Sequence, residues 1–215
     1  MSRETRANHV IAIVGAESTG KTTLAGELQA ALQRDGRSVA LVGEYLREFC
    51  DRHARTPRVD EQAGIAQEQT RRIAAAAETH DIVIADTTAL MIAVYSEQVF
   101  GDRSLYDSAI EAQRGCALTL LTALDIPWQA DGLQRDGPQV REPVTALVRA
   151  ALARGGLGYS VVAGTGPARL SHALLAVRHA LLEPSVLDEA RANPRWQWVC
   201  ERCGDAACEQ RHWLP

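Results

Sequence analysis

Short apolar runs alternate with amphipathic stretches along most of the chain. Runs rich in β-branched residues predict buried strands at residues 10–14, 39–42, 82–85, 117–121 and 159–163. After residue 20, apolar side chains recur every four positions, at Leu24, Leu28 and Leu32, which predicts a helix that stops at Asp35-Gly36. Similar patterns predict helices at residues 45–54, 60–80, 88–98, 103–115, 142–153 and 167–182. This alternation predicts an α/β fold, with helices on both faces of a mostly parallel five-stranded sheet.

The composition adds limits to this picture. The chain has 215 residues, of which 46% are hydrophobic and 23% charged, as in an ordinary soluble domain. We expect one domain at residues 1–183, then a linker and tail at 184–215. The net charge of −4 argues against a dedicated nucleic-acid binder. Apolar runs fall short of the ~20 residues of a membrane span, and the polar start does not resemble a signal peptide, so we expect a cytoplasmic protein with no membrane partner. The oligomeric state stays open.

A phosphate-binding motif lies between the first strand and the first helix. Residues 15–22, Gly-Ala-Glu-Ser-Thr-Gly-Lys-Thr, fit G-x-x-x-x-G-K-[ST] at every fixed position. The glycines let successive N–H groups point at phosphate oxygens, and the helix dipole adds positive potential. Lys21 is expected to reach the β- and γ-phosphates, and the Thr22 hydroxyl to ligate Mg²⁺. The predicted nucleotide-binding residues are Gly15, Glu17, Ser18, Thr19, Gly20, Lys21, Thr22 and Thr23. A chance match on a glycine-rich turn is the alternative.

Two acids stand at the ends of the second and third strands, where open α/β sheets bind ligands. Asp86 is expected to hold Mg²⁺ directly or through water; the alternative is an N-cap of the next helix. Glu44 is a candidate general base or hydroxyl-binding group for a substrate; the alternative is a solvated acid at a helix start. Arg47 follows one helical turn later and is expected either to orient Glu44 or to contact the substrate, unless it is an ordinary surface arginine.

Two further loops carry candidate residues. Residues 125–141 are rich in glycine and proline and include Arg135 and Arg141, candidates for a closing lid that stabilises charge during phosphoryl transfer. An ordinary surface loop is the alternative. After the fifth strand, Gly164 stands where backbone could approach an adenine ring, although a plain strand-to-helix turn fits as well.

Four segments in this order resemble the NadR-like ribosylnicotinamide kinase domain. They are residues 15–24, 44–49, 84–87 and 126–133, and the resemblance covers residues 9–180. It implies a P-loop NTPase sandwich of three layers that transfers the γ-phosphate of ATP to the 5′-hydroxyl of a ribosylated nicotinamide. Glu44 and Asp86 would face the substrate ribose and Mg²⁺, while Asp131, Arg135 and Arg141 would belong to the lid. The family's adenylyltransferase domain is expected to be missing, because nine residues precede the first strand.

The chain departs from the family where aromatic rings would stack on the nicotinamide. Gly43 precedes the acid of the second strand, and Glu68 stands near the place of the helix aromatic. Tyr45 and Trp128 are the candidate replacements, and Trp128 is predicted to bind substrate together with Asp131. The lid also differs, since Gln134 stands where an arginine often follows Gly-Leu.

The Cys-rich tail has the ligand spacing of a structural zinc site, C-x₂-C-x₄-C-x₃-H. Its candidate ligands are Cys200, Cys203, Cys208 and His212, with solvent-facing or redox cysteines as the alternative. The sequence as a whole predicts an ATP- and Mg²⁺-dependent kinase acting on a small-molecule acceptor. The alternatives are a P-loop ATPase that couples hydrolysis to a partner protein through the tail and, less favoured by charge, a nucleic-acid-associated protein.

Overall fold

A parallel sheet forms the centre of the fold in this computed structural model, which describes residues 8–129 and 137–182. Its strands are β1 (His9–Val14), β2 (Val39–Val42), β3 (Ile82–Asp86), β4 (Leu118–Thr122) and β5 (Ser160–Val162). Every strand pair is parallel and the order is β2-β3-β1-β4-β5. The predicted strands are therefore confirmed, and the described sheet is wholly rather than mostly parallel.

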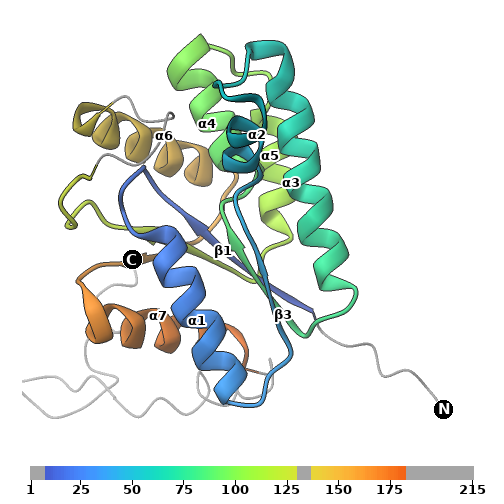
Figure 1. The fold of residues 1–215 in the computed structure, drawn as a ribbon. Helices are drawn as coiled ribbons and strands as arrows, with labels where there is room; N and C mark the ends of the chain where they lie inside the picture. The colour runs from blue at the N-terminus through green and yellow to red at the C-terminus, as the bar shows by residue number, and fades with distance from the viewer. Residues whose placement is uncertain (1–7, 130–136, 183–215) are drawn as a thin grey trace, which may run out of the picture. The chain divides into compact units, whose positions relative to one another are not determined.

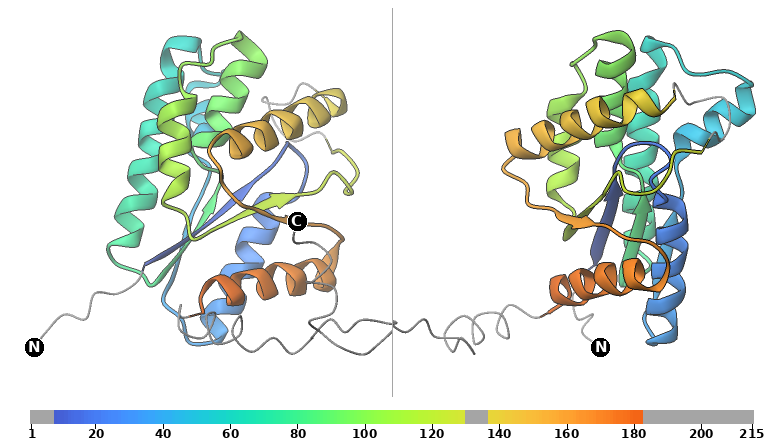
Figure 2. Two further views of the ribbon diagram at one scale, coloured as in Figure 1. Left: turned by 180° about the vertical axis from the view of Figure 1, so that it is seen from behind. Right: turned by 90° about the vertical axis from the view of Figure 1, so that its left-hand side faces the viewer.

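Helices cover both faces of the sheet, as Figures 1 and 2 show. On one face lie α1 (Lys21–Arg34) and α7 (Gly166–Ala180), which pack against each other. The other face carries α2 (Tyr45–His53), α3 (Gln62–Ala77), α4 (Ala89–Phe100), α5 (Tyr106–Arg114) and α6 (Arg141–Arg154). Two 3-10 turns, η1 (Val59–Glu61) and η2 (Pro138–Val140), precede α3 and α6. These layers bury β1 and β3 on both sides, which explains their continuous apolar sequences.

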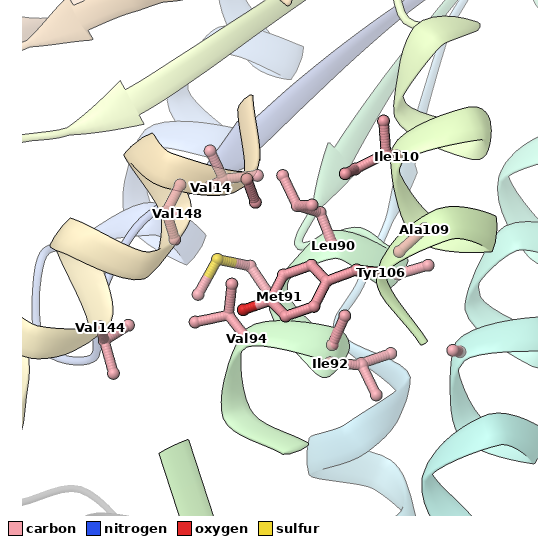
Figure 3. Close-up of a cluster of buried hydrophobic side chains, with 14 of the residues drawn as sticks. Val14, Leu90, Met91, Ile92, Val94, Tyr106, Ala109, Ile110, Val144 and Val148 are labelled. Carbon is pink, nitrogen blue, oxygen red and sulfur yellow. The ribbon is translucent and has the colours of Figure 1, made fainter. Parts of the chain in front are cut away.

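A hydrophobic core cluster lies between the sheet and the helices of this second face, with α4 at its centre (Figure 3). α4 packs against α3, α5 and α6, and its residues Ala89–Val94 are all buried. Such an all-round apolar stretch is typical of a helix enclosed by neighbours. The enclosure ends near the C-terminus of α4, where Val99 and Phe100 are 54% and 41% exposed.

The described residues up to Ala180 form one compact unit. The expected domain boundary between residues 183 and 184, like the Cys-rich tail, lies outside the described residues. Within the described part of the chain, no helix is both long enough and apolar enough to cross a membrane.

Candidate active site

The phosphate loop joins β1 to α1 through backbone conformations that need glycine. Gly15 has φ of 145°, and a Cβ there would lie 2.1 Å from Thr122 Oγ1 at the end of β4. Gly20, which precedes α1, has the left-handed φ of 71°. The Thr122 hydroxyl also lies 2.7 Å from that of Thr19, which donates to Ala16 O at 2.7 Å. The loop is therefore held against β4 by a buried hydroxyl pair that leaves no room for a larger residue at position 15.

Lys21 and Ser18 lie along the same loop. The Lys21 ammonium donates to Ala16 O at 2.8 Å, so its charge lies over the loop. Ser18 Oγ donates to Gln129 O at 2.5 Å, which links the loop to the segment after β4. Backbone N–H groups, a helix N-terminus and one ammonium are what a triphosphate requires.

The two residues predicted to hold Mg²⁺ meet where β3 ends beside α1. Thr22 Oγ1 donates to Asp86 Oδ2 at 2.6 Å, which joins the two predicted Mg²⁺ ligands. Asp86 Oδ1 is buried and has no hydrogen-bond partner among the described residues. A buried carboxylate oxygen without a partner, beside a hydroxyl, suits an oxygen-seeking cation such as Mg²⁺. The residue at the N-cap of α4 is Thr88, not Asp86, so the N-cap alternative for Asp86 is not what the structure has.

Thr87, directly after Asp86, is strained. It has φ of 80°, a left-handed conformation that costs a β-branched residue about 1–3 kcal/mol. Its N–H donates to Ile13 O at 3.1 Å, while its hydroxyl is buried without a partner among the described residues. Strain of this kind gathers where a fold positions a functional group.

Glu44 and Arg47 form an ion pair at the start of α2. Arg47 Nε lies 3.7 Å from Glu44 Oε2, and the Glu44 side chain is 17% exposed. Glu44 occupies the N-cap position of α2, yet its side chain makes no capping hydrogen bond. The carboxylate is therefore directed to other contacts, and the predicted orienting role of Arg47 agrees with this geometry.

Gln69, on α3, joins the two strand ends that carry the acids. Its Oε1 accepts from Tyr45 N at 2.8 Å, and its Nε2 donates to Gly43 O at 3.2 Å and to Thr87 O at 3.1 Å. Gln69 is fully buried. One amide thus contacts the residues on either side of Glu44 and the residue that follows Asp86, so it fixes the spacing of the two carboxylates.

Arg169, on α7, connects the phosphate loop to the loop after β5. Its guanidinium donates to Thr19 O at 2.5 Å and to Gly164 O at 3.2 Å, and lies 3.9 Å from Asp125. Asp125 in turn accepts from Gly164 N. Burial lowers the pKa of Arg169 from its usual range, while Asp125 and then Glu27 oppose that shift. The predicted base-binding loop around Gly164 is therefore tied to the phosphate loop by a buried arginine.

Several of these groups line a cavity of about 960 Å³, whereas Asp86, Gln69 and Gly164 are not among its described lining residues. The phosphate loop forms its floor, and the β5–α7 loop with Arg169 and Glu27 lines one side. Glu44, Arg47 and the Thr56-Pro57 segment line it farther along the α2 side. Gln62 of α3 lines it as well, with Thr87 between β3 and α4 and four residues of α4, Met91, Tyr95, Val99 and Phe100. Ile126, Pro127 and Gln129, after β4, complete the lining. A cavity of this size has room for a nucleotide and a second small molecule.

Some predicted site residues lie away from this cavity. Arg141 is the first residue of α6 rather than part of the preceding loop, and its buried side chain donates to Ile126 O at 2.9 Å. Trp128 is half-buried and is not among the described residues that line the cavity. The Tyr45 ring is covered by the Arg72 guanidinium, 4.4 Å from its centroid.

Other predicted residues lie outside the described part of the chain. They are Asp131 and Arg135 of the expected lid and the four expected zinc ligands, Cys200, Cys203, Cys208 and His212. Zinc binding stays a prediction from the sequence.

Comparison with known proteins now identifies the family. A family model described as an AAA domain, AAA_28, matches residues 10–169. The chain belongs to the AAA_28 family. It is accordingly an ATP-using enzyme, of the phosphotransferase or ATPase type. A search of curated proteins finds no match.

Two solved structures share the fold. A crystal structure of NadR protein in complex with NR has a TM-score of 0.66 and 21% identity, covering 81% of this chain and 52% of its own. A crystal structure of NadR protein in complex with NAD and AMP-PNP has a TM-score of 0.65 and 20% identity, covering 81% of this chain and 50% of its own. This member of the family thus spans about half the length of those proteins, and the expected likeness to NadR is confirmed for the fold.

Three buried polar residues on the helices of the site were not predicted from the sequence, namely Gln62, Gln69 and Arg169. Each lies on the side of its helix that otherwise carries apolar, buried residues. The buried positions of α3 are Gln62, Ile65, Ala66 and Gln69, and those of α7 are Arg169, Ala173 and Val177. A polar residue at a position where the helical repeat predicts an apolar one is the signal that could have indicated them.

Proposed function

We propose that this chain is a Mg²⁺-dependent kinase that transfers the γ-phosphate of ATP to a hydroxyl of a nucleoside-like acceptor. The observation that carries the proposal is the shared cavity: the phosphate loop and Glu44 line the same space. An ATPase needs the first of these, whereas an acid that lines the same cavity as the phosphate loop suits a kinase with a second substrate. The solved NadR structures, whose ligands include NR and AMP-PNP, support the same interpretation.

The donor half of the site would hold the triphosphate. N–H groups of the loop would bind the phosphate oxygens, and Lys21 would leave Ala16 O to contact the β- and γ-phosphates. Thr22 and Asp86 would hold Mg²⁺, which neutralises the charge that develops on the phosphates. The loop after β5, fixed by Arg169, would receive the base.

The acceptor half would activate the hydroxyl. Glu44 would accept the proton of the attacking hydroxyl as that oxygen bonds to the γ-phosphorus, while the bond from this phosphorus to the β–γ bridging oxygen breaks and ADP leaves. Arg47 would hold the carboxylate in place through their ion pair. Asp131 and Arg135 stay the predicted lid residues, which would add charge stabilisation and exclude water on closure.

The test is a panel of nucleosides, with nicotinamide riboside included, incubated with ATP and Mg²⁺. Phosphorylated product is read by mass spectrometry, and hydrolysis is read as phosphate release. We expect a phosphorylated nucleoside, and at least about a hundredfold loss of its formation in Glu44→Gln, on the scale of one general base. Hydrolysis without a phosphorylated product from any member would favour the partner-coupled ATPase instead.

Two variants separate the roles in the donor half. Lys21→Ala should abolish turnover, since the phosphates would lose the ammonium that the loop provides. Asp86→Asn should keep ATP binding but raise the Mg²⁺ concentration needed for half-maximal rate, because an amide is a weaker ligand than a carboxylate. An unchanged Mg²⁺ requirement in Asp86→Asn would contradict the assigned metal role.

A further inference from the structure

Gln62 is a buried polar residue with an unused amide oxygen. It is the first residue of α3, is 4% exposed and lines the cavity. Its Oε1 is buried and has no hydrogen-bond partner among the described residues. Native structures leave few such atoms without a partner, and those that remain commonly receive a ligand or an ordered water. The neighbouring buried glutamine of α3, Gln69, uses its whole amide in protein contacts.

An apolar wall faces the same space from α4. Met91, Tyr95 and Val99 follow one another at four-residue spacing and so share one side of the helix. All three line the cavity, and Phe100 joins them at the C-terminus of α4. Val99 and Phe100 are among the exposed large apolar side chains of the described residues. Exposed apolar side chains that are grouped along a cavity indicate a surface for binding a ligand, which apolar residues scattered over the surface do not.

Tyr95 connects this wall to the phosphate loop. Its hydroxyl donates to Glu17 Oε2 at 3.1 Å, and Glu17 is the third residue of the loop. The wall therefore contacts the phosphate loop at Tyr95. Glu17 and Glu44, both lining the cavity, give this region an acidic border.

We propose that Gln62 and the α4 wall (Met91, Tyr95, Val99 and Phe100) bind the part of the acceptor that does not react. The acceptor then consists of the attacking hydroxyl near Glu44 and an attached planar, apolar ring system. The ring packs on the α4 wall and carries an N–H or O–H group that donates to Gln62 Oε1. This inference rests on the proposed kinase function, and it assigns the ring recognition to α3 and α4 rather than to Tyr45 or Trp128.

The amide has consequences for selectivity. A site built to receive a hydrogen bond discriminates strongly against an analogue that lacks the donor, because the buried oxygen then stays unpaired. Acceptors with a ring donor should therefore be preferred over ring analogues without one. Free ribose, which has no ring system to pack on α4, should be a poor substrate.

The test uses the full chain with the nucleoside that gives most product in the wild-type panel. We expect Gln62→Leu to raise the KM of that nucleoside at least about tenfold, the scale of one unpaired buried group, with the KM for ATP within about twofold of wild type. Gln62→Glu, which keeps an accepting oxygen, should raise it less. Gln67→Leu is the matched control, because Gln67 is an exposed glutamine on the same helix, and its nucleoside KM should not change.

Phe100→Ala tests the wall without opening the core, since Phe100 is exposed. It should raise the nucleoside KM about threefold or more and leave the KM for ATP unchanged. An unchanged nucleoside KM in both Gln62→Leu and Phe100→Ala would overturn this inference while the kinase function stands. So would free ribose phosphorylated as efficiently as the nucleoside. No phosphorylated product from the wild type would overturn the kinase function itself, and this inference with it.

Discussion

The amide of Gln69 offers a direct test of how the two acids are positioned. Gln69→Glu keeps the size of the side chain and an oxygen that can accept from Tyr45 N. It replaces the N–H₂ group that donates to Gly43 O and Thr87 O by a second oxygen. Both carbonyls then lose a donor and face a carboxylate oxygen. Because these carbonyls adjoin Glu44 and Asp86, the ends of β2 and β3 should move apart.

The size of the effect follows from those contacts. A buried polar group left without its partner costs about 1–3 kcal/mol, so two carbonyls give about 2–6 kcal/mol. Where the introduced carboxyl takes up a proton, it restores one donor. We therefore expect a loss of folding stability in the lower half of that range. The free energy of unfolding of a native protein is about 5–15 kcal/mol in total, so the variant should stay folded. Displacing a catalytic group by about 1 Å can lower the rate of a reaction about a hundredfold. We therefore expect kcat to fall about ten- to a hundredfold.

The assay pairs urea unfolding with steady-state kinetics on the phosphorylated nucleoside. Gln67→Glu is the control, because it adds the same charge to an exposed position of α3. The KM for ATP should change little, since the hydrogen bonds of Gln69 go to the β2 and β3 ends rather than to the phosphate loop. As pH falls, a larger fraction of the carboxyl introduced by Gln69→Glu carries the proton that lets it donate, so part of kcat should recover relative to wild type. Equal kcat and equal stability in the two variants would refute the positioning role.

Three further predictions follow from described contacts. Gly15→Ala should destabilise the fold by about 3 kcal/mol or more and abolish ATP binding, because its methyl would overlap the β4 threonine hydroxyl. Gly36→Ala, also at positive φ but in open space, should cost only about 1–2 kcal/mol in urea unfolding; equal losses would contradict the overlap. Arg169→Lys should raise the KM for ATP about tenfold without changing the acceptor KM, because an ammonium cannot span both loops. Burial raises the pKa of the Cys50 and Cys116 thiols to about 11. Peptide mapping after alkylation at pH ~8 should therefore show about a hundredfold less labelling of each cysteine than of an unfolded thiol. The labelling of each should continue to increase with pH above about 10.

Much of the fold could be predicted because its patterns are local. Each strand is a short apolar run, and each predicted helix matches an observed one within a few residues. The phosphate loop was predictable for the same reason, since its chemistry depends on consecutive backbone groups. The pairing of Thr22 with Asp86 follows from strand order: β1 and β3 are neighbours, so the start of α1 and the end of β3 meet. Local sequence could also place Glu44 at the end of β2, though it could not give its hydrogen-bond environment.

The proposed acceptor half of the site was harder to predict, because its residues come from helices whose sequences resemble those of core helices. Gln62 lies on the buried side of α3, together with Ile65 and Ala66. Tyr95 and Val99 continue the apolar side of α4, and both also line the cavity. Tyr95 packs against the core cluster as well, so its sequence position alone does not separate the two environments. Whether a helix position faces the core or a cavity depends on where the neighbouring helices and strands end. That arrangement is set by the packing of the whole fold and not by local sequence. A buried polar side chain at such a position is costly unless it has a partner. Where the protein supplies the partner, as at Gln69, the residue holds the site together; where it does not, as at Gln62, the partner is expected from the substrate.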